Sequence, residues 1–176
     1  MKREILFRGK RICENKNWVE GCLLNLDTDS GHVFIVPFFH GASTLPICRL
    51  VEYRSAYVNP ETVGQFTGVY DTELTKIYEG DIVRFLRYVC TVVFEEGCFG
   101  LALNINDAFD WDYIDEEMKE YAGTNQITAC FNDHFISLWE ILWNFNCDQN
   151  ICNVVEVIGN IHDNLELLEG GVKNDC

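Results

Sequence analysis

The chain has 176 residues, of which 48% are hydrophobic and 13% aromatic, enough apolar material for one domain with a sizeable core. Its net charge of −15, from 13 basic and 28 acidic residues, disfavours direct binding to nucleic acid or to anionic membranes, because both attract Lys and Arg. No apolar run approaches the ~20 residues of a transmembrane helix and no secretory signal is recognisable, so we expect a cytoplasmic protein.

The N-terminal half predicts short strands separated by polar turns. Apolar and β-branched residues gather at 4–8, 18–24, 32–36, 49–53 and 63–68. Residues 9–17 and 27–31 are polar and glycine-containing, which is typical of turns and loops. Asn59 and Pro60 begin another turn, since Pro fixes its own φ and keeps the preceding residue out of the helical region.

The C-terminal half predicts a meander of strands, then two helices and a final strand. The strands are expected at 82–86, 90–94, 98–103 and 153–161, with a turn at 95–97 and another at 77–81. One helix is expected at 113–121, and the second at 137–145, where Ser137 and Glu140 have capping-box spacing.

These patterns predict a mainly β fold, with a small, strongly bent antiparallel sheet or barrel-like core and one or two short helices. We expect one domain, residues 1–176. Its parts would be an N-terminal β region (1–58), a core (59–105 with 153–168) and an acidic, helical insertion (106–146).

Carboxylates crowd residues 106–120, and carboxylates can bind divalent cations. The weak candidates for metal ligands are Asp107, Asp110, Asp112 and Asp115. An EF-hand beginning at Asn104 fails because its fifth position is Ala108 and its glycine is missing. We therefore predict a solvated acidic surface with no bound metal or cofactor.

The remaining reactive residue types form no catalytic motif. The nine cysteines include no C-x-x-C, and the closest pair is Cys147 and Cys152, so we expect reduced thiols, several of them packed as small hydrophobic residues. The four histidines are scattered, and the motifs of hydrolases, P-loop enzymes and dinucleotide-binding enzymes are absent. A Cys–His nucleophilic pair stays open, because such partners meet in space rather than in sequence. We predict no catalytic residue and no enzymatic activity.

Five segments, in this order and spacing, resemble the YopX family of phage and prophage proteins. They are REILFRGK (3–10), WVEG (18–21), NPETVGQFTG (59–68), KIYEGDIV (76–83) and VEVIGNI (155–161). Residues 71–75 depart from the family pattern, which often has an Asn-Gly turn there. The acidic stretch 106–120 falls where such sequences vary, so we interpret it as an insertion.

The resemblance implies a β-rich fold, a phage or prophage origin and a location in the cytoplasm of a bacterial host, but no reaction. The family-motif residues are apolar, small or turn-forming, so we expect them to be structural. They are Gly64, Gln65, Gly68, Tyr78, Glu79, Gly80, Asp81, Gly159 and Asn160.

Three functions are compatible with these observations. The first is a non-enzymatic phage accessory protein that binds an unidentified host or phage protein, or another copy of itself. The second is an acidic DNA mimic that inhibits a nucleic-acid enzyme by occupying its basic groove. The third is a metal-dependent hydrolase that uses the carboxylates of residues 107–117.

Overall fold

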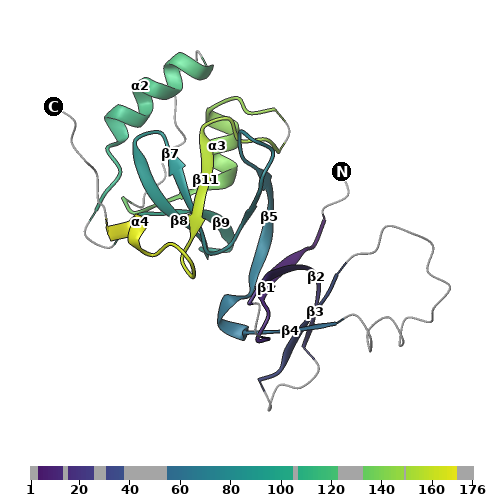
Figure 1. Ribbon diagram of the computed structural model, residues 1–176. Helices are drawn as coiled ribbons and strands as arrows, with labels where there is room; N and C mark the ends of the chain where they lie inside the picture. The colour runs from purple at the N-terminus through teal and green to yellow at the C-terminus, as the bar shows by residue number, and fades with distance from the viewer. Residues whose placement is uncertain are drawn as a thin grey trace. The chain divides into compact units, whose positions relative to one another are not determined.

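The computed structural model describes residues 4–13, 16–25, 31–37, 55–104, 107–122, 133–148 and 150–169 (Figure 1). The chain divides into two compact units, residues 1–66 and 67–176. The N-terminal part expected from the sequence ends at residue 58, eight residues earlier. The strand predicted at 49–53 lies outside the described residues.

Short strands dominate both units. The first unit contains β1 (Phe7–Lys10), β2 (Trp18–Asn25), β3 (Val33–Val36), β4 (Ala56–Val58) and the 3₁₀ helix η1 (Pro60–Thr62). β5 (Gly64–Tyr70) runs from the first unit into the second. The second unit continues with β6 (Lys76–Tyr78), β7 (Asp81–Phe85), β8 (Tyr88–Glu95), β9 (Cys98–Ala102), α2 (Trp111–Ala122), β10 (Phe135–Ser137), α3 (Leu138–Asn144), β11 (Val155–Asn160) and α4 (Glu166–Glu169).

The first unit is an antiparallel sheet in the order β4-β3-β2-β1-β5, around a small core. The core residues are Val19, Ile35, Ala56 and Val58. Gly9 in β1 allows the strands to pack closely, because a Cβ at this position would lie 3.2 Å from side-chain atoms of both Ile35 and Val58. A larger residue at position 9 would therefore push this core apart.

The second unit contains a five-stranded antiparallel sheet in the order β10-β9-β8-β7-β11. β8 and β9 are joined by a two-residue turn, where Glu96 (φ 52°) and Gly97 (φ 83°) both have positive φ. Positive φ at both central residues is the geometry that matches the twist of a hairpin. The turn predicted at residues 95–97 is thus confirmed.

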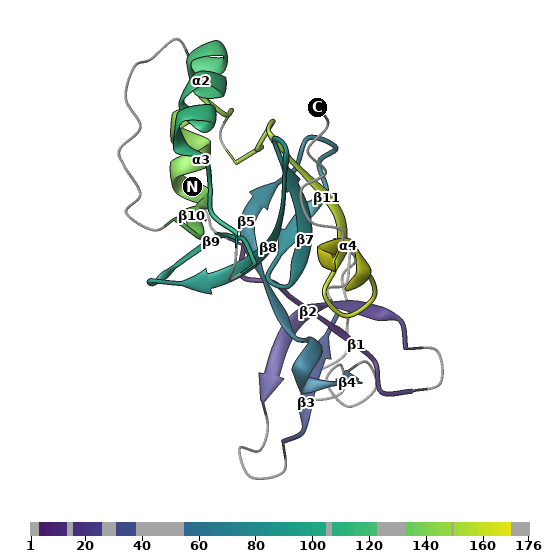
Figure 2. The same cartoon turned by 90° about the vertical axis from the view of Figure 1, so that its left-hand side faces the viewer.

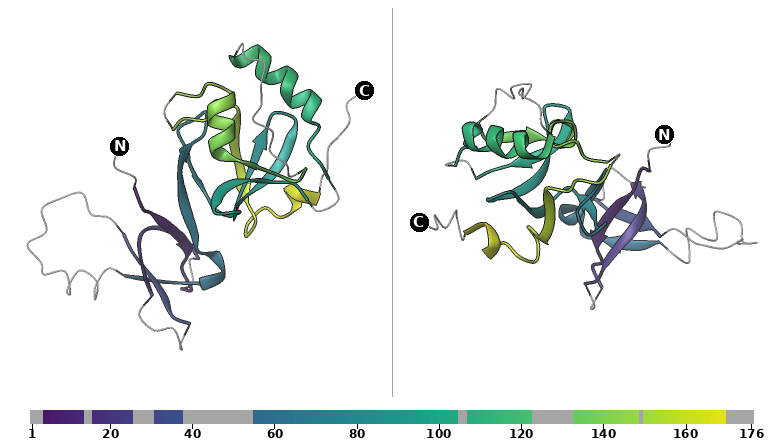
Figure 3. Two further views of the ribbon diagram at one scale, coloured as in Figure 1. Left: turned by 180° about the vertical axis from the view of Figure 1, so that it is seen from behind. Right: turned by 90° about the horizontal axis from the view of Figure 1, so that it is seen from above.

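The helices α2 and α3 lie on one side of this sheet, and α4 lies on the other (Figures 2 and 3). α2 contributes Ile114 and Met118 to the buried core, one helical turn apart, and α3 contributes Leu138 and Ile141. Between helices and sheet, the ring of Phe85 packs edge-on against that of Phe145, 5.7 Å between centroids. These residues hold α2 and α3 in fixed positions on the sheet.

The predicted fold class is confirmed: the protein is mostly β, with two antiparallel sheets and short helices, although the sheets do not close into a barrel. The first strand lies at residues 7–10 rather than 4–8, and β6 occupies part of the segment predicted as a turn. No helix in the described ranges is long and apolar enough to cross a membrane.

Candidate functional site

Within the acidic segment, the side chain of Asp110 caps the start of α2. One oxygen of this carboxylate accepts a hydrogen bond from the backbone N–H of Tyr113 at 3.2 Å, which is the role of a helix N-cap. The other oxygen accepts from the Arg87 guanidinium at 2.8 Å. The Tyr113 N–H and Arg87 together lower the pKa of Asp110, because both favour the charged carboxylate.

Arg87, in the turn between β7 and β8, connects the sheet to this helix end. Its guanidinium lies 3.9 Å from the ring centroid of Tyr113 and 5.3 Å from that of Tyr88. The Tyr88 hydroxyl in turn accepts a hydrogen bond from the backbone N–H of Asp110 at 2.9 Å. Asp110, the best-connected of the predicted metal candidates, is therefore occupied with fixing the start of α2.

The other three candidates do not converge on Asp110. Asp112 points to solvent, Asp115 is half-buried, and the backbone carbonyl of Asp107 is hydrogen-bonded to the imidazole of His134. Across the described part of the chain, no three side chains of the kinds that bind metals come together. What the structure brings together around Asp110 is a hydrogen-bonded aromatic and charged cluster rather than a set of ligands.

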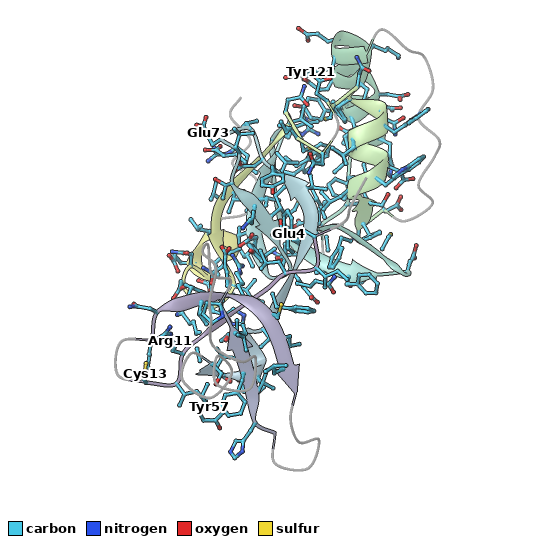
Figure 4. All side chains as sticks on the ribbon, turned by 90° about the vertical axis from the view of Figure 1, so that its right-hand side faces the viewer. Glu4, Arg11, Cys13, Tyr57, Glu73 and Tyr121 are labelled. Atoms are coloured by element: carbon cyan, nitrogen blue, oxygen red, sulfur yellow. The ribbon has the colours of Figure 1, made fainter. Side chains whose placement is uncertain are left out.

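The solvent-facing sides of α2 and α3 are acidic and aromatic. We use the term outer helix surface for five of their exposed residues, Asp112, Glu116, Glu120, Trp139 and Trp143; Lys119 and Tyr121 of α2 are exposed as well. The two Trp side chains are 64% and 68% exposed, and their rings stack nearly parallel, with an interplanar angle of 9° and centroids 5.7 Å apart. Figure 4 shows oxygen-tipped side chains projecting outward from these helices, with Tyr121 labelled near the end of α2.

The tryptophans are exposed because the core-facing stripe of α3 runs through other residues. Leu138, Ile141 and Phe145 recur at helical spacing and are buried, so positions 139 and 143 fall on the opposite side. Trp139 is apolar like the neighbouring Leu138, yet it is exposed whereas Leu138 is buried. The signal that separates them is that Trp139 and Trp143, four residues apart, share a helix face that differs from the face of Leu138, Ile141 and Phe145.

Charge is distributed unevenly between the two units. Residues 1–66 carry eight basic and seven acidic side chains, a net charge of +1. Residues 67–176 carry five basic and 21 acidic side chains, a net charge of −16. The whole acidic excess of the protein therefore belongs to the unit that carries the outer helix surface.

The family-motif residues around Asp81 build a tight turn between β6 and β7. The buried carboxylate of Asp81 accepts a hydrogen bond from the backbone N–H of Tyr78 at 2.7 Å, and Tyr78 itself is buried. Gly80 has φ of +79°, a conformation that residues with a Cβ rarely adopt. Its N–H donates to Val92 O and its carbonyl accepts from Ile161 N–H, so the turn is held by β8 and by the end of β11.

The other motif residues also lie in backbone positions with steric or hydrogen-bonding demands. Gly64 and Gln65 pair with β1, Gly68 has φ of +90°, and a Cβ on Gly159 would lie 2.8 Å from the Asn164 side chain. The side-chain carbonyl oxygen of Asn160 accepts hydrogen bonds from the backbone N–H groups of His162 and Asp163, both at 3.0 Å. Gly68, Gly80, Asp81, Gly159 and Asn160 therefore each meet a local steric or hydrogen-bonding demand.

Comparison with known proteins gives one family. The sequence profile described as YopX protein matches residues 7–169, which is most of the chain. The chain belongs to the YopX family. None of the curated proteins compared with this YopX sequence matches it significantly. Among solved structures, it is similar to the crystal structure of protein EF1440 from Enterococcus faecalis, with 18% identity, coverage of 95% of this chain and 99% of that chain, and a TM-score of 0.44.

Proposed function

We propose that this YopX protein is a phage or prophage accessory protein that works in the bacterial cytoplasm by binding another protein, without catalysing a reaction. The outer helix surface is the binding region. The observation that carries the proposal is the stacked, solvent-exposed pair Trp139 and Trp143 on a unit of net charge −16.

Exposing two neighbouring Trp side chains is unfavourable unless a partner covers them. Each large aromatic side chain buries about 150–250 Å² when it is covered, and Trp is enriched among the residues that dominate binding energy at interfaces. α3 is held on its core side by Leu138, Ile141 and Phe145 and capped by Ser137, so the two rings are presented on a rigid helix. A preorganised aromatic anchor loses little entropy on binding.

The electrostatics define the chemistry of the partner. An acidic unit attracts a basic protein surface over a distance of about 8 Å at physiological ionic strength and repels acidic ones. Trp faces also attract guanidinium and ammonium groups directly. The partner that fits both features is a host or phage protein with exposed Arg and Lys side chains.

The test is affinity capture from the native host with the complete protein as bait. Wild type should retain a stoichiometric partner, and Trp139→Ala/Trp143→Ala should lose it, by about 30-fold or more in affinity, since interface Trp truncations cost about 2 kcal/mol or more. The matched control is Leu165→Ala, which removes an apolar side chain of similar exposure elsewhere in the same unit. The complex should also weaken steeply as salt is raised.

Two outcomes would contradict the proposal. One is capture of no stoichiometric partner together with a monomeric mass in solution, which would also remove self-association. The other is a partner retained equally by wild type and by the double Trp variant, which would move binding away from the outer helix surface.

A narrower form of the same idea is mimicry of DNA. The concentration of 21 acidic residues in one unit favours it, because rows of carboxylates can occupy a basic groove that normally holds phosphates. A captured partner that is a nucleic-acid enzyme, and that is released from this protein by added duplex DNA, would support mimicry. A partner that binds DNA and this protein at the same time would exclude it.

A further inference from the structure

Two cysteine side chains lie at the ends of a tight turn that follows α3. The backbone N–H of Cys147 donates to Leu142 O at 3.0 Å, part of a helix end in which Asn146 has φ of +50°. Beyond it, Ile151 N–H donates to Asp148 O at 3.0 Å, an i to i+3 bond that reverses the chain. Cys147 and Cys152 flank this reversal and are therefore neighbours in space.

The far side of the turn is attached to β5. Tyr70 N–H donates to Asn150 O at 2.8 Å, and Cys152 N–H donates to Tyr70 O at 2.7 Å. These bonds form part of a parallel bridge between Tyr70 and Ile151. Cys152 is thus fixed to the sheet, while Cys147 is fixed to the end of α3.

The two thiols influence each other's ionisation but have different surroundings. Cys152 is fully buried in the core cluster, and Cys147 is only half-buried. The S–H of Cys152 and the backbone N–H of Asn153 lower the pKa of Cys147 to about 7, despite its partial burial and the nearby charge of Asp148. The same thiol contact, with burial, raises the pKa of Cys152.

This asymmetry distinguishes the pair from the other described thiols. Cys90 is buried without a thiol partner, and desolvation raises its pKa. Burial and the charges of Glu140 and Glu96 raise the pKa of Cys98. A partly exposed cysteine with a lowered pKa, next to a buried one, is the arrangement in which a first thiolate attacks and a second resolves the product.

We propose that Cys147 and Cys152 form a redox-active dithiol that is modified by low-molecular-weight disulfides. The Cys147 thiolate attacks one sulfur of the disulfide RSSR, giving a mixed disulfide Cys147–S–S–R and releasing RS⁻. Cys152 then attacks the Sγ of Cys147, and its proton passes to the departing sulfur, so that the second half of the disulfide leaves as RSH. Two protein thiols are oxidised to one disulfide, and RSSR is reduced to two thiols.

The modification is tested on the complete, reduced protein with oxidised glutathione as the probe. Differential alkylation and peptide mass spectrometry at neutral pH should find a disulfide joining Cys147 to Cys152, which dithiothreitol reverses. Cys152→Ala should stop at one glutathione on Cys147, and Cys147→Ser should leave Cys152 unmodified. Cys98→Ser is the matched control and should form the disulfide as the wild type does.

A measurement on the wild-type protein gives a second test that does not depend on the folding of Cys152→Ala. The alkylation rate of Cys147 should rise with pH and level off above about pH 7, whereas that of Cys98 should still be rising at about pH 9. At neutral pH, Cys147 should react about 10-fold faster than Cys98. Cys147 and Cys152 that stay reduced while Cys13 or Cys22 takes up glutathione, or a Cys147 rate no greater than that of Cys98, would overturn the proposal.

Discussion

The buried carboxylate of Asp71 accepts a hydrogen bond from the backbone N–H of Val157, 86 residues away in sequence, at 3.0 Å. Its other oxygen accepts from the backbone N–H groups of Glu73, at 2.9 Å, and Thr75, at 2.7 Å. One side chain thus organises the turn between β5 and β6 and ties it to β11. The side chain of Asp71 thus closes residues 71–75.

Replacing Asp71 should destabilise the second unit strongly. Asp71→Ala leaves three backbone donors without their acceptor in a buried site, and we expect a loss of about 3 kcal/mol in the free energy of unfolding. Asp71→Asn keeps one acceptor oxygen, so its free energy of unfolding should fall by less. Urea denaturation measures both, with the exposed Glu73→Ala as the control. A loss below about 1 kcal/mol for Asp71→Ala would show that water replaces the carboxylate.

The start of α3 depends on a reciprocal cap. Ser137 Oγ accepts from the Glu140 N–H at 3.1 Å, and the Glu140 carboxylate accepts from the Ser137 N–H, also at 3.1 Å. Ser137→Ala should cost about 1 kcal/mol, and Ser137→Thr, which keeps a hydroxyl, should cost less. Thermal denaturation of the three proteins provides the comparison. Equal losses for both variants would mean that packing at this buried position, not the cap, sets the stability.

The cap also shows which parts of the fold are predictable from sequence. Ser137 and Glu140 determine a helix start through contacts between residues three apart, so the spacing alone predicts it correctly. The strands Ala56–Val58 and Phe135–Ser137 are missed because each has only three residues, too few to show a period. They become strands through pairing with β3 and β9, which are distant in sequence.

The candidate sites are harder to predict from the sequence than the helix start. The density of carboxylates suggests metal ligands among Asp107, Asp110, Asp112 and Asp115. Asp110 instead pairs with Arg87, 23 residues earlier, because the sheet brings the β7–β8 turn next to the start of α2. The Trp139 and Trp143 pair needed knowledge of which face of α3 is buried. The contact of Cys147 with Cys152 depends on a turn that is held by Tyr70, and no local pattern reports that contact.

Gly100 in β9 occupies a position with no room for a side chain. A Cβ there would lie 2.3 Å from the Phe135 ring and 2.5 Å from Ile136 O, so Gly100→Ala must displace β10. We expect a loss of about 3 kcal/mol in the free energy of unfolding. Gly97→Ala tests backbone strain alone, because position 97 has φ of +83° and open space around it, and it should cost about 1 kcal/mol.

A second substitution separates crowding from strain at position 100. Phe135→Leu shortens the ring that the new methyl group meets, so the double variant Gly100→Ala/Phe135→Leu should lose less stability than the sum of the two single variants. Losses that simply add would show that the contact with the Ile136 carbonyl, rather than the ring, sets the cost.

The Arg87–Asp110 pair should make the anchoring of α2 sensitive to acid. The N–H of Tyr113 and the Arg87 guanidinium lower the pKa of Asp110 from its ordinary 3.8, so the folded protein binds the proton less readily than the unfolded chain. The resulting stabilisation is fully present above the ordinary pKa and is lost as the pH falls through the folded-state value. Asp110→Asn keeps an N-cap but has no charge to titrate, so its deficit relative to wild type should be constant from pH 7 down to about 5 and should shrink below about 3.8. Urea denaturation across this range measures the deficit, and Glu116→Gln on the same helix is the charge-matched control. A deficit that is independent of pH would show that the ion pair does not stabilise the helix end.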